Sequence, residues 1–168
     1  VLISFTTPFV GMGLYSNITR KFHKLPKDKM AAYMSNLWLL LFFSFSFVFL
    51  TMSFGIMIYG DLFGLPKHWI LVLPIMSAMN TLNQFNLTIL RNQEKAFRYG
   101  SIEFANTALN LSVTLLLILG YNMGWEGRAM GMLVASAAFS IAAVIMIVRG
   151  GYFSWVIDRK IINEIMKV

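Results

Sequence analysis

Two sets of polar side chains recur at helical spacing inside stretches that are otherwise apolar. The first polar face consists of Ser77, Asn80, Asn83, Gln84, Thr88 and Arg91, and the second of Tyr99, Glu103, Asn106, Asn110 and Thr114. Because residues three or four apart lie on one side of a helix, each set occupies a single helix face. Carboxamides and a carboxylate are costly in hydrocarbon, so we expect the two faces to meet each other or to line a polar lumen.

Hydrogen bonding between helices is the simpler explanation for any single amide, since it supplies only about 1 kcal/mol per contact in membrane bundles. The two faces together favour a lumen. Glu103 supports this interpretation because it is the only acidic residue within an expected membrane span. Its carboxylate suits ion or proton coupling or a cationic partner. A salt bridge to Arg98 or Arg91 is an equally good alternative.

Basic residues form a third candidate group at the expected inner mouth of the lumen. Its members are Arg20, Arg91, Lys95 and Arg98, with Asn17 about one turn before Arg20. Such a group suits anionic headgroups. The alternative is that most of this charge only sets the orientation of the chain in the membrane.

The helices that must carry these residues are predicted by hydropathy. The chain is 58% hydrophobic and 12% charged, which is more apolar surface than a soluble domain of 168 residues can bury. Five uncharged runs approach or exceed the length of about 20 residues that crosses ~30 Å of hydrocarbon. The expected spans cover about 1–19, 32–59, 69–90, 100–120 and 128–148.

Lys and Arg gather in every second gap between these spans. Five lie in 20–29, three in 91–98 and four in 149–168, whereas each of the other two gaps holds one. The positive-inside rule therefore places the cation-rich gaps in the cytoplasm. The net charge of +7 is better explained by this topology and by anionic phospholipid than by binding to nucleic acid.

The predicted fold class is an all-α integral membrane protein. A transmembrane bundle of five helices occupies 1–151, and an amphipathic helix at 152–168 lies on the inner surface as a connector. Thr7-Pro8 with Gly11 and Gly13 predicts a bend in the first span. Close helix packing is predicted by the small residues Gly127, Gly131 and Ala135. Since Val1 is not an initiator Met and the chain stops inside an amphipathic pattern, we expect a piece of a longer protein.

The residue types argue against an enzyme. There is no cysteine, and the two histidines, His23 and His68, lie in gaps on opposite sides of the membrane. Neither a metal site nor a Ser-His-Asp arrangement can be assembled from them. We expect no catalytic residue, no metal and no cofactor, with coupling to a proton or a sodium ion left open.

Three stretches carry a resemblance to a known family. The stretch 91–99 is similar to the inner loop between the fourth and fifth helices of O-antigen type polysaccharide flippases, in the multidrug/oligosaccharidyl-lipid/polysaccharide exporter superfamily. Asn106 and Asn110 followed by 124–131 resemble the next two helices, and Thr7-Pro8 with Gly13 and the cationic loop from Arg20 resembles the second helix. The resemblance covers nearly the whole chain, as helices two to six of the amino-terminal lobe of a two-lobe transporter.

The resemblance implies a transporter of the bacterial inner membrane. Its parent would flip undecaprenyl-diphosphate-linked oligosaccharide for the synthesis of surface polysaccharide such as lipopolysaccharide. The expected partners are this lipid-linked oligosaccharide, anionic phospholipid and the remainder of the transporter. The expected substrate and lumen residues are Asn17, Arg20, Asn80, Asn83, Gln84, Arg91, Arg98, Glu103, Asn106 and Asn110.

Three other functions compete with this one. A multidrug or cation-coupled exporter of the same superfamily would carry more buried carboxylates and aromatic residues. A membrane-embedded transferase needs a buried cluster of His or Asp, which the spans between 69 and 148 lack. A purely structural membrane scaffold would leave both polar faces unexplained.

Overall fold

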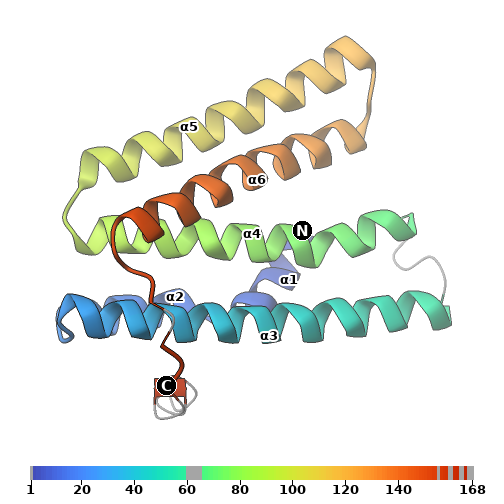
Figure 1. Cartoon of the computed structure of the whole chain (residues 1–168). Coiled ribbons are helices and arrows are strands. Elements are labelled where there is room, and N and C mark those ends of the chain that lie inside the picture. Colours follow the sequence, from blue (N-terminus) through green and yellow to red (C-terminus); the bar gives the residue numbers. More distant parts are fainter. Residues whose placement is uncertain (1, 60–65, 155, 159–160, 163–164, 166–168) are drawn as a thin grey trace.

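The computed structural model describes residues 2–59, 66–154, 156–158, 161–162 and 165, and its regular elements are all helical. In chain order they are α1 (Leu2–Gly11), α2 (Leu14–Phe22), α3 (Lys27–Tyr59), α4 (Lys67–Asn92), α5 (Ala96–Leu115), the π-helical turn η1 (Leu116–Gly120) and α6 (Trp125–Arg149). Figure 1 shows α3, α4 and α6 stacked in successive layers, with α5 outermost. The all-α prediction is confirmed.

Three described helices are long and apolar enough to cross a membrane. They are the segments Lys27–Ile58, Ala96–Gly120 and Trp125–Arg149. On α3 the side chains of Phe42, Phe47 and Phe54 are exposed, as hydrocarbon-facing residues would be. The other two expected spans coincide with α4 and with the pair α1 and α2. Helix α4 is long enough to cross a membrane but less apolar, and α1 and α2 are each too short.

Helix α4 is the central helix of the bundle and contacts α1, α2, α3 and α6. Half of its 26 residues are buried, including Ser77, Thr81, Asn83 and Asn86. A helix enclosed by other helices can carry amides and hydroxyls, because neighbouring helices rather than lipid surround them. This placement explains why α4 is more polar than α3 or α6.

The bend expected in the first span is a complete break. Helix α1 ends at Gly11, and Met12 and Gly13 take the left-handed conformation with φ of 42° and 65° before α2 begins. Gly11 lies close to α4, since a Cβ on it would be 3.0 Å from the Thr81 hydroxyl oxygen. The Thr6 and Ser77 hydroxyl oxygens, 2.7 Å apart, join the same two helices.

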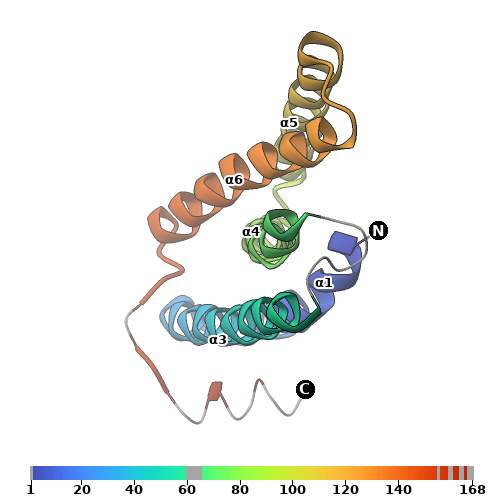
Figure 2. The same cartoon turned by 90° about the vertical axis from the view of Figure 1, so that its right-hand side faces the viewer.

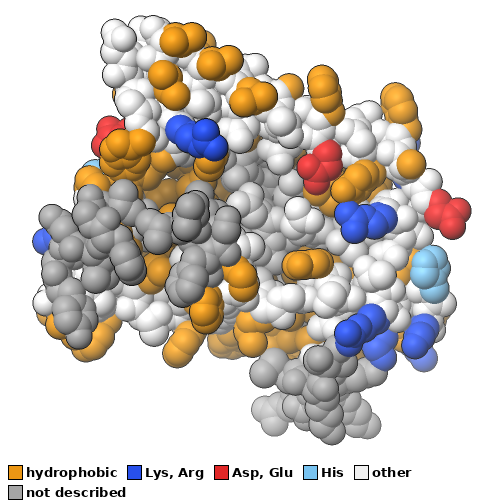
Figure 3. Space-filling view, turned by 180° about the vertical axis from the view of Figure 1, so that it is seen from behind, with side chains coloured by type: hydrophobic (Ala, Val, Ile, Leu, Met, Phe, Trp, Pro, Cys, Tyr) orange, Lys and Arg blue, Asp and Glu red, His pale blue; other side chains and the backbone are white. Residues whose placement is uncertain are grey.

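The two ends of the bundle differ in character. The ends of α2, α4 and α6, together with the start of α3, lie at one end, where the cation-rich gaps are found (Figure 1). Most of the Lys and Arg side chains visible from behind gather at this end (Figure 3). At the opposite end the rings of Trp69 and Trp125 lie 5.6 Å apart, and indoles are favoured at membrane interfaces.

The segment after α6 departs from the prediction. Residues 150–154 and 156–158, which we call the strap, pass down beside α3 without forming a helix (Figure 2). The predicted amphipathic helix at 152–168 is therefore wrong over 152–154 and 156–158. Ile161, Ile162 and Ile165 are helical, and residues 155, 159–160, 163–164 and 166–168 lie outside the described residues.

Side chains of α3 hold the strap in this extended form. Asn36, which is fully buried, donates from Nδ2 to the Val156 carbonyl at 3.1 Å and accepts the Asp158 N–H at Oδ1, also at 3.1 Å. The Ser154 N–H donates to Ser35 Oγ at 3.0 Å. These bonds satisfy backbone groups that a helix would otherwise satisfy internally, so an extended strap is tolerated here.

Asn36→Ala is expected to release the strap. It removes both hydrogen bonds between Asn36 and the strap, each contributing about 1 kcal/mol. Hydrogen–deuterium exchange at the Asp158 amide should accelerate roughly thirtyfold as a result. Ser46→Ala is the matched control, because the Ser46 hydroxyl bonds only the Phe42 carbonyl of its own helix. Equal exchange in both variants would show that other contacts hold the strap.

Candidate functional site

The first polar face lies along the central helix, and its amide side chains have three different environments. The Ser136 hydroxyl of α6 donates to Asn80 Oδ1 at 3.0 Å, which joins α4 to α6. Asn83 is buried, and its Oδ1 has no hydrogen-bond partner among the described residues. Gln84 is exposed on another side of the helix. Ser77 and Arg91 of the same face also bond other helices. The face therefore combines interhelical hydrogen bonds with the amides of Asn83 and Gln84.

The second polar face lies on the outermost helix. No described residue of α5 is fully buried, and Glu103, Asn106 and Asn110 are half-buried. The Thr114 hydroxyl donates to Asn110 Oδ1 within the helix at 3.3 Å. Side chains on the other side of α5, such as Phe104, are exposed and apolar. Helix α5 is thus amphipathic although it is long enough to cross a membrane.

The two polar faces meet only at the cation-rich end, where Arg91 of the first face contacts Tyr99 of the second. Helix α5 packs mainly on α6, and α6 in turn packs on α4 (Figure 1). The expectation that the faces meet each other directly is therefore wrong for their other residues and holds only at Arg91 and Tyr99. Asn80 of the first face contacts Ser136, whereas Thr114 of the second face packs against Gly131, so α6 separates the faces at these positions.

The expected small-residue packing is confirmed on α6. Gly127, Gly131 and Ala135 are buried. A Cβ on Gly131 would overlap the Thr114 hydroxyl and lie 3.0 Å from the Thr114 backbone nitrogen. A Cβ on Gly127 would lie 3.2 Å from side-chain atoms of Leu117 and Ile118 in η1. These glycines let the backbones of α5 and α6 approach closely.

Glu103 and Arg91 do not pair with each other. Arg91 donates from Nη2 to the Tyr99 hydroxyl at 3.0 Å, and its guanidinium carbon lies 5.1 Å from the centre of the Tyr99 ring. The Glu103 carboxylate forms no ion pair with any residue in the described part of the chain. The alternative that explained Glu103 by a structural salt bridge to Arg91 or Arg98 is not realised.

The expected basic group is divided between separate places. Asn17 and Arg20 line a cavity of about 260 Å³ on α2 together with Ile165. Arg91 is exposed, and its guanidinium donates a hydrogen bond to the Tyr99 hydroxyl. Only Lys95 and Arg98 reach the larger cavity at the cation-rich end.

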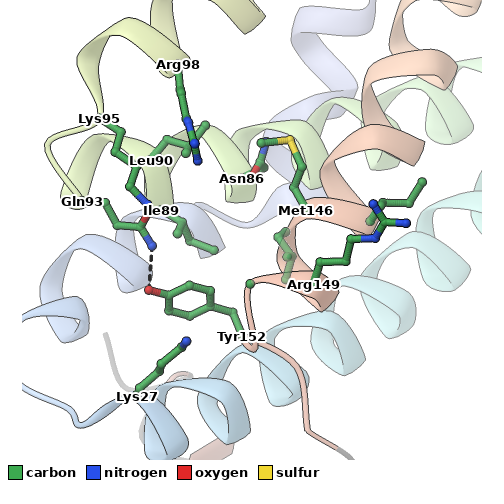
Figure 4. A pocket seen from close by; sticks show the side chains of 13 residues that line it. Lys27, Asn86, Ile89, Leu90, Gln93, Lys95, Arg98, Met146, Arg149 and Tyr152 are labelled. Atoms are coloured by element: carbon green, nitrogen blue, oxygen red, sulfur yellow. Dashed lines mark hydrogen bonds between the residues drawn. The ribbon is translucent and has the colours of Figure 1, made fainter.

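This larger cavity, which we call the basic cavity, has a volume of about 540 Å³. Its described polar lining consists of Lys27, Asn86, Gln93, Lys95, Arg98, Arg149 and Tyr152. In Figure 4 Lys95 and Arg98 come from the start of α5, Lys27 and Tyr152 lie across the cavity, and Arg149 extends from the end of α6. Four cations from three helix ends and the loop before α5 thus share one concave surface.

Tyr152 forms the wall that closes the cavity toward α2 and α3. Its hydroxyl accepts a hydrogen bond of 2.6 Å from Gln93 Nε2, and Lys27 Nζ lies 5.6 Å from the ring centre. The ring stacks on Phe22 at 6.1 Å. Contacts with α2, α3 and α4 therefore fix this side chain in place.

Sequence reasoning missed five of these lining residues as a group, namely Lys27, Asn86, Gln93, Arg149 and Tyr152. Lys27 and Arg149 were counted only as charges that orient the chain. The one local signal was the pair Gly150-Gly151 before Tyr152, since adjacent glycines at a helix end mark a sharp turn. Their convergence depends on contacts between residues more than 50 positions apart.

Comparisons of this chain with protein family models, with curated proteins and with solved structures find no match.

Proposed function

We propose that the chain is part of a membrane transporter that moves a lipid-linked oligosaccharide from the inner to the outer leaflet. The observation that carries this proposal is the half-buried polar face of α5, with Glu103, Asn106 and Asn110 on a helix long enough to cross a membrane. An intramembrane carboxylate and amides without partners on other described helices mark a substrate or ion pathway in helical bundles.

The break between α1 and α2 supports the same function. Transporters commonly place substrate or ion sites beside discontinuous helices, whose freed backbone groups face a cavity. Here the break at Met12 and Gly13 borders the small cavity that Asn17 and Arg20 line. Helix α1 is joined to the central helix at Ser77, a residue of the first polar face.

The substrate class rests on the resemblance to O-antigen type flippases, with undecaprenyl diphosphate as the lipid carrier. In this proposal the oligosaccharide contacts the amides of α4 and α5, and the second lobe of the parent covers the open face of α5. A cation-coupled exporter of the same superfamily is the second candidate, favoured by the carboxylate of Glu103, which pairs with none of the residues that the structure describes.

The proposal is tested in cells that lack the complete protein. Glu103→Gln and Asn106→Leu are expected to lower surface glycan at least tenfold and to accumulate lipid-linked precursor, with normal protein levels in the membrane. Phe104→Leu, on the exposed apolar side of α5, is the control and should complement fully. Full complementation by Glu103→Gln and Asn106→Leu would refute transport along this face. Drug efflux without any change in glycan would select the exporter.

A further inference from the structure

The described lining of the basic cavity carries positive charge and no carboxylate. All four charged residues among its described lining, Lys27, Lys95, Arg98 and Arg149, are cations. Asp28 and Glu94, which each follow or precede a lining cation in the sequence, are exposed and do not line the cavity. Like charges around one concave surface repel each other and attract an anion.

Orientation in the membrane does not account for this arrangement. The positive-inside rule requires cations near the ends of spans, but it is satisfied wherever they point. Lys24 and Lys29 meet the rule without lining the cavity. The cations that line the cavity come from α3, α5, α6 and the loop before α5, and only the tertiary fold brings them together.

The hydrogen-bond donors of the cavity suit phosphate oxygens. Arg98 offers a planar guanidinium that can donate two parallel hydrogen bonds, and Lys27 and Lys95 offer ammonium donors. Because Gln93 donates to the Tyr152 oxygen, the Tyr152 hydroxyl keeps its own proton for another acceptor. The site thus presents donors from several directions and no carboxylate that would repel an anion.

The other walls of the cavity are apolar. They are formed by Ile89 and Leu90 of α4 and by Ile145, Met146 and Ile147 of α6. These residues lie in the last turns of the two helices, next to the cation-rich end. A ligand that fits both kinds of wall has an anionic head and a hydrocarbon portion.

The turn that carries Tyr152 is specified by two glycines. A Cβ on Gly150 would lie 2.9 Å from the Met146 carbonyl oxygen. Gly151 has φ of +73°, a conformation that favours glycine, and a Cβ there would lie 3.4 Å from Lys27 Nζ. The backbone turn therefore sets where the Tyr152 side chain enters the wall of the cavity.

We propose that the basic cavity binds the phosphate group of an amphipathic anion at the inner membrane surface, with Lys27, Lys95, Arg98 and Tyr152 as donors. The lipid portion contacts the apolar wall formed by α4 and α6. A bilayer phospholipid and a polyprenyl diphosphate share this chemistry. The assignment rests on the cavity itself and does not require that the bound lipid be the transported substrate.

The test measures lipid binding to the purified complete protein in a neutral detergent, by native mass spectrometry. The probes are phosphatidylglycerol, a polyprenyl diphosphate, inorganic diphosphate and phosphate-free diacylglycerol. We expect saturable binding of phosphate-bearing lipid and at least tenfold weaker binding in Lys95→Gln/Arg98→Gln. The matched control, Lys24→Gln/Lys29→Gln, removes the same charge from the same end outside the cavity and should bind as the native protein does.

The probes also identify the source of the phosphate. Tighter binding of phosphatidylglycerol indicates a bilayer lipid, tighter binding of the polyprenyl diphosphate indicates the carrier lipid, and equal binding of inorganic diphosphate indicates that the apolar wall is not used. Equal losses in both double variants, or binding of diacylglycerol equal to that of the phosphate lipids, would overturn the proposal.

Two further variants keep the test decisive. If Lys95→Gln/Arg98→Gln does not fold, Lys27→Gln should still weaken binding several-fold, and Arg98→Lys should recover part of the affinity. Native affinity in both would overturn the proposal. Since lipid binding is measured without transport, a protein that binds phosphate lipid but does not restore surface glycan refutes the proposed function and leaves this site intact.

Discussion

Gly131→Ala is expected to lower the free energy of unfolding by about 1 to 3 kcal/mol, as overpacking of a tight interface does. The added methyl would overlap the Thr114 hydroxyl and lie 3.0 and 3.1 Å from the Thr114 backbone nitrogen and Cα. Helix backbone cannot move aside as a side chain can, so α5 and α6 must separate. Unfolding by titration with sodium dodecyl sulfate measures the loss.

Gly100→Ala in α5 is the matched control for this substitution. A Cβ on Gly100 has no atom within 4 Å, so the same change there should be neutral or stabilise the helix by up to about 1 kcal/mol. The double variant Gly131→Ala/Thr114→Ala should recover only part of the loss, because it relieves the overlap with the hydroxyl but not the close approach to backbone. Equal stability of Gly131→Ala and Gly100→Ala would contradict the tight α5–α6 contact.

Labelling of single cysteines in spheroplasts is expected to assign each tested loop to one side of the membrane only. His68→Cys and Tyr121→Cys should react with an impermeant maleimide from outside, whereas Ala96→Cys should react only after permeabilisation. All three positions are exposed, and the chain has no native cysteine that would interfere. The physical reason is that Lys and Arg near the anionic inner surface each contribute about 1 kcal/mol to this orientation.

The pair His68 and Ala96 decides whether α4 crosses the membrane. His68 lies in the first turn of α4, and Ala96 lies just beyond its last turn. Helix α4 is long enough to cross a membrane, but its composition is not apolar enough to identify it as a span. Opposite accessibility at the two positions would establish that a polar helix enclosed by its neighbours spans the bilayer. Labelling of both from the same side would instead place α4 outside the hydrocarbon and remove the five-span arrangement.

The helices were predicted well because their cause is local. Uncharged runs of about 20 residues predicted α3, α5 with η1, and α6 within a few residues of their observed bounds. The break near Gly13 followed from proline and glycine, whose backbone preferences act within one turn. Gly127 and Gly131 were recognised because small residues four apart always share a helix face.

The conformation of the strap could not be predicted from its own sequence. Residues 152–168 alternate apolar and charged side chains as an amphipathic helix would, and this pattern predicted a helix from 152 onward. Asn36, more than a hundred residues earlier, instead bonds the backbone of Val156 and Asp158 in an extended form. No property of the strap's own residues reveals that partner.

The sequence by itself determined the helical class, the apolar spans, the alternation of charge and the polar residues of the two faces, because each depends on residues adjacent in the chain. The tertiary structure alone decided that Arg91 pairs with Tyr99, that α6 separates the two faces at Asn80 and Thr114, and that Lys27, Arg98 and Tyr152 surround one cavity. The physical reason is that several helix pairings can satisfy the same hydropathy. Contacts between particular surfaces, such as Gly131 against Thr114, select one of them.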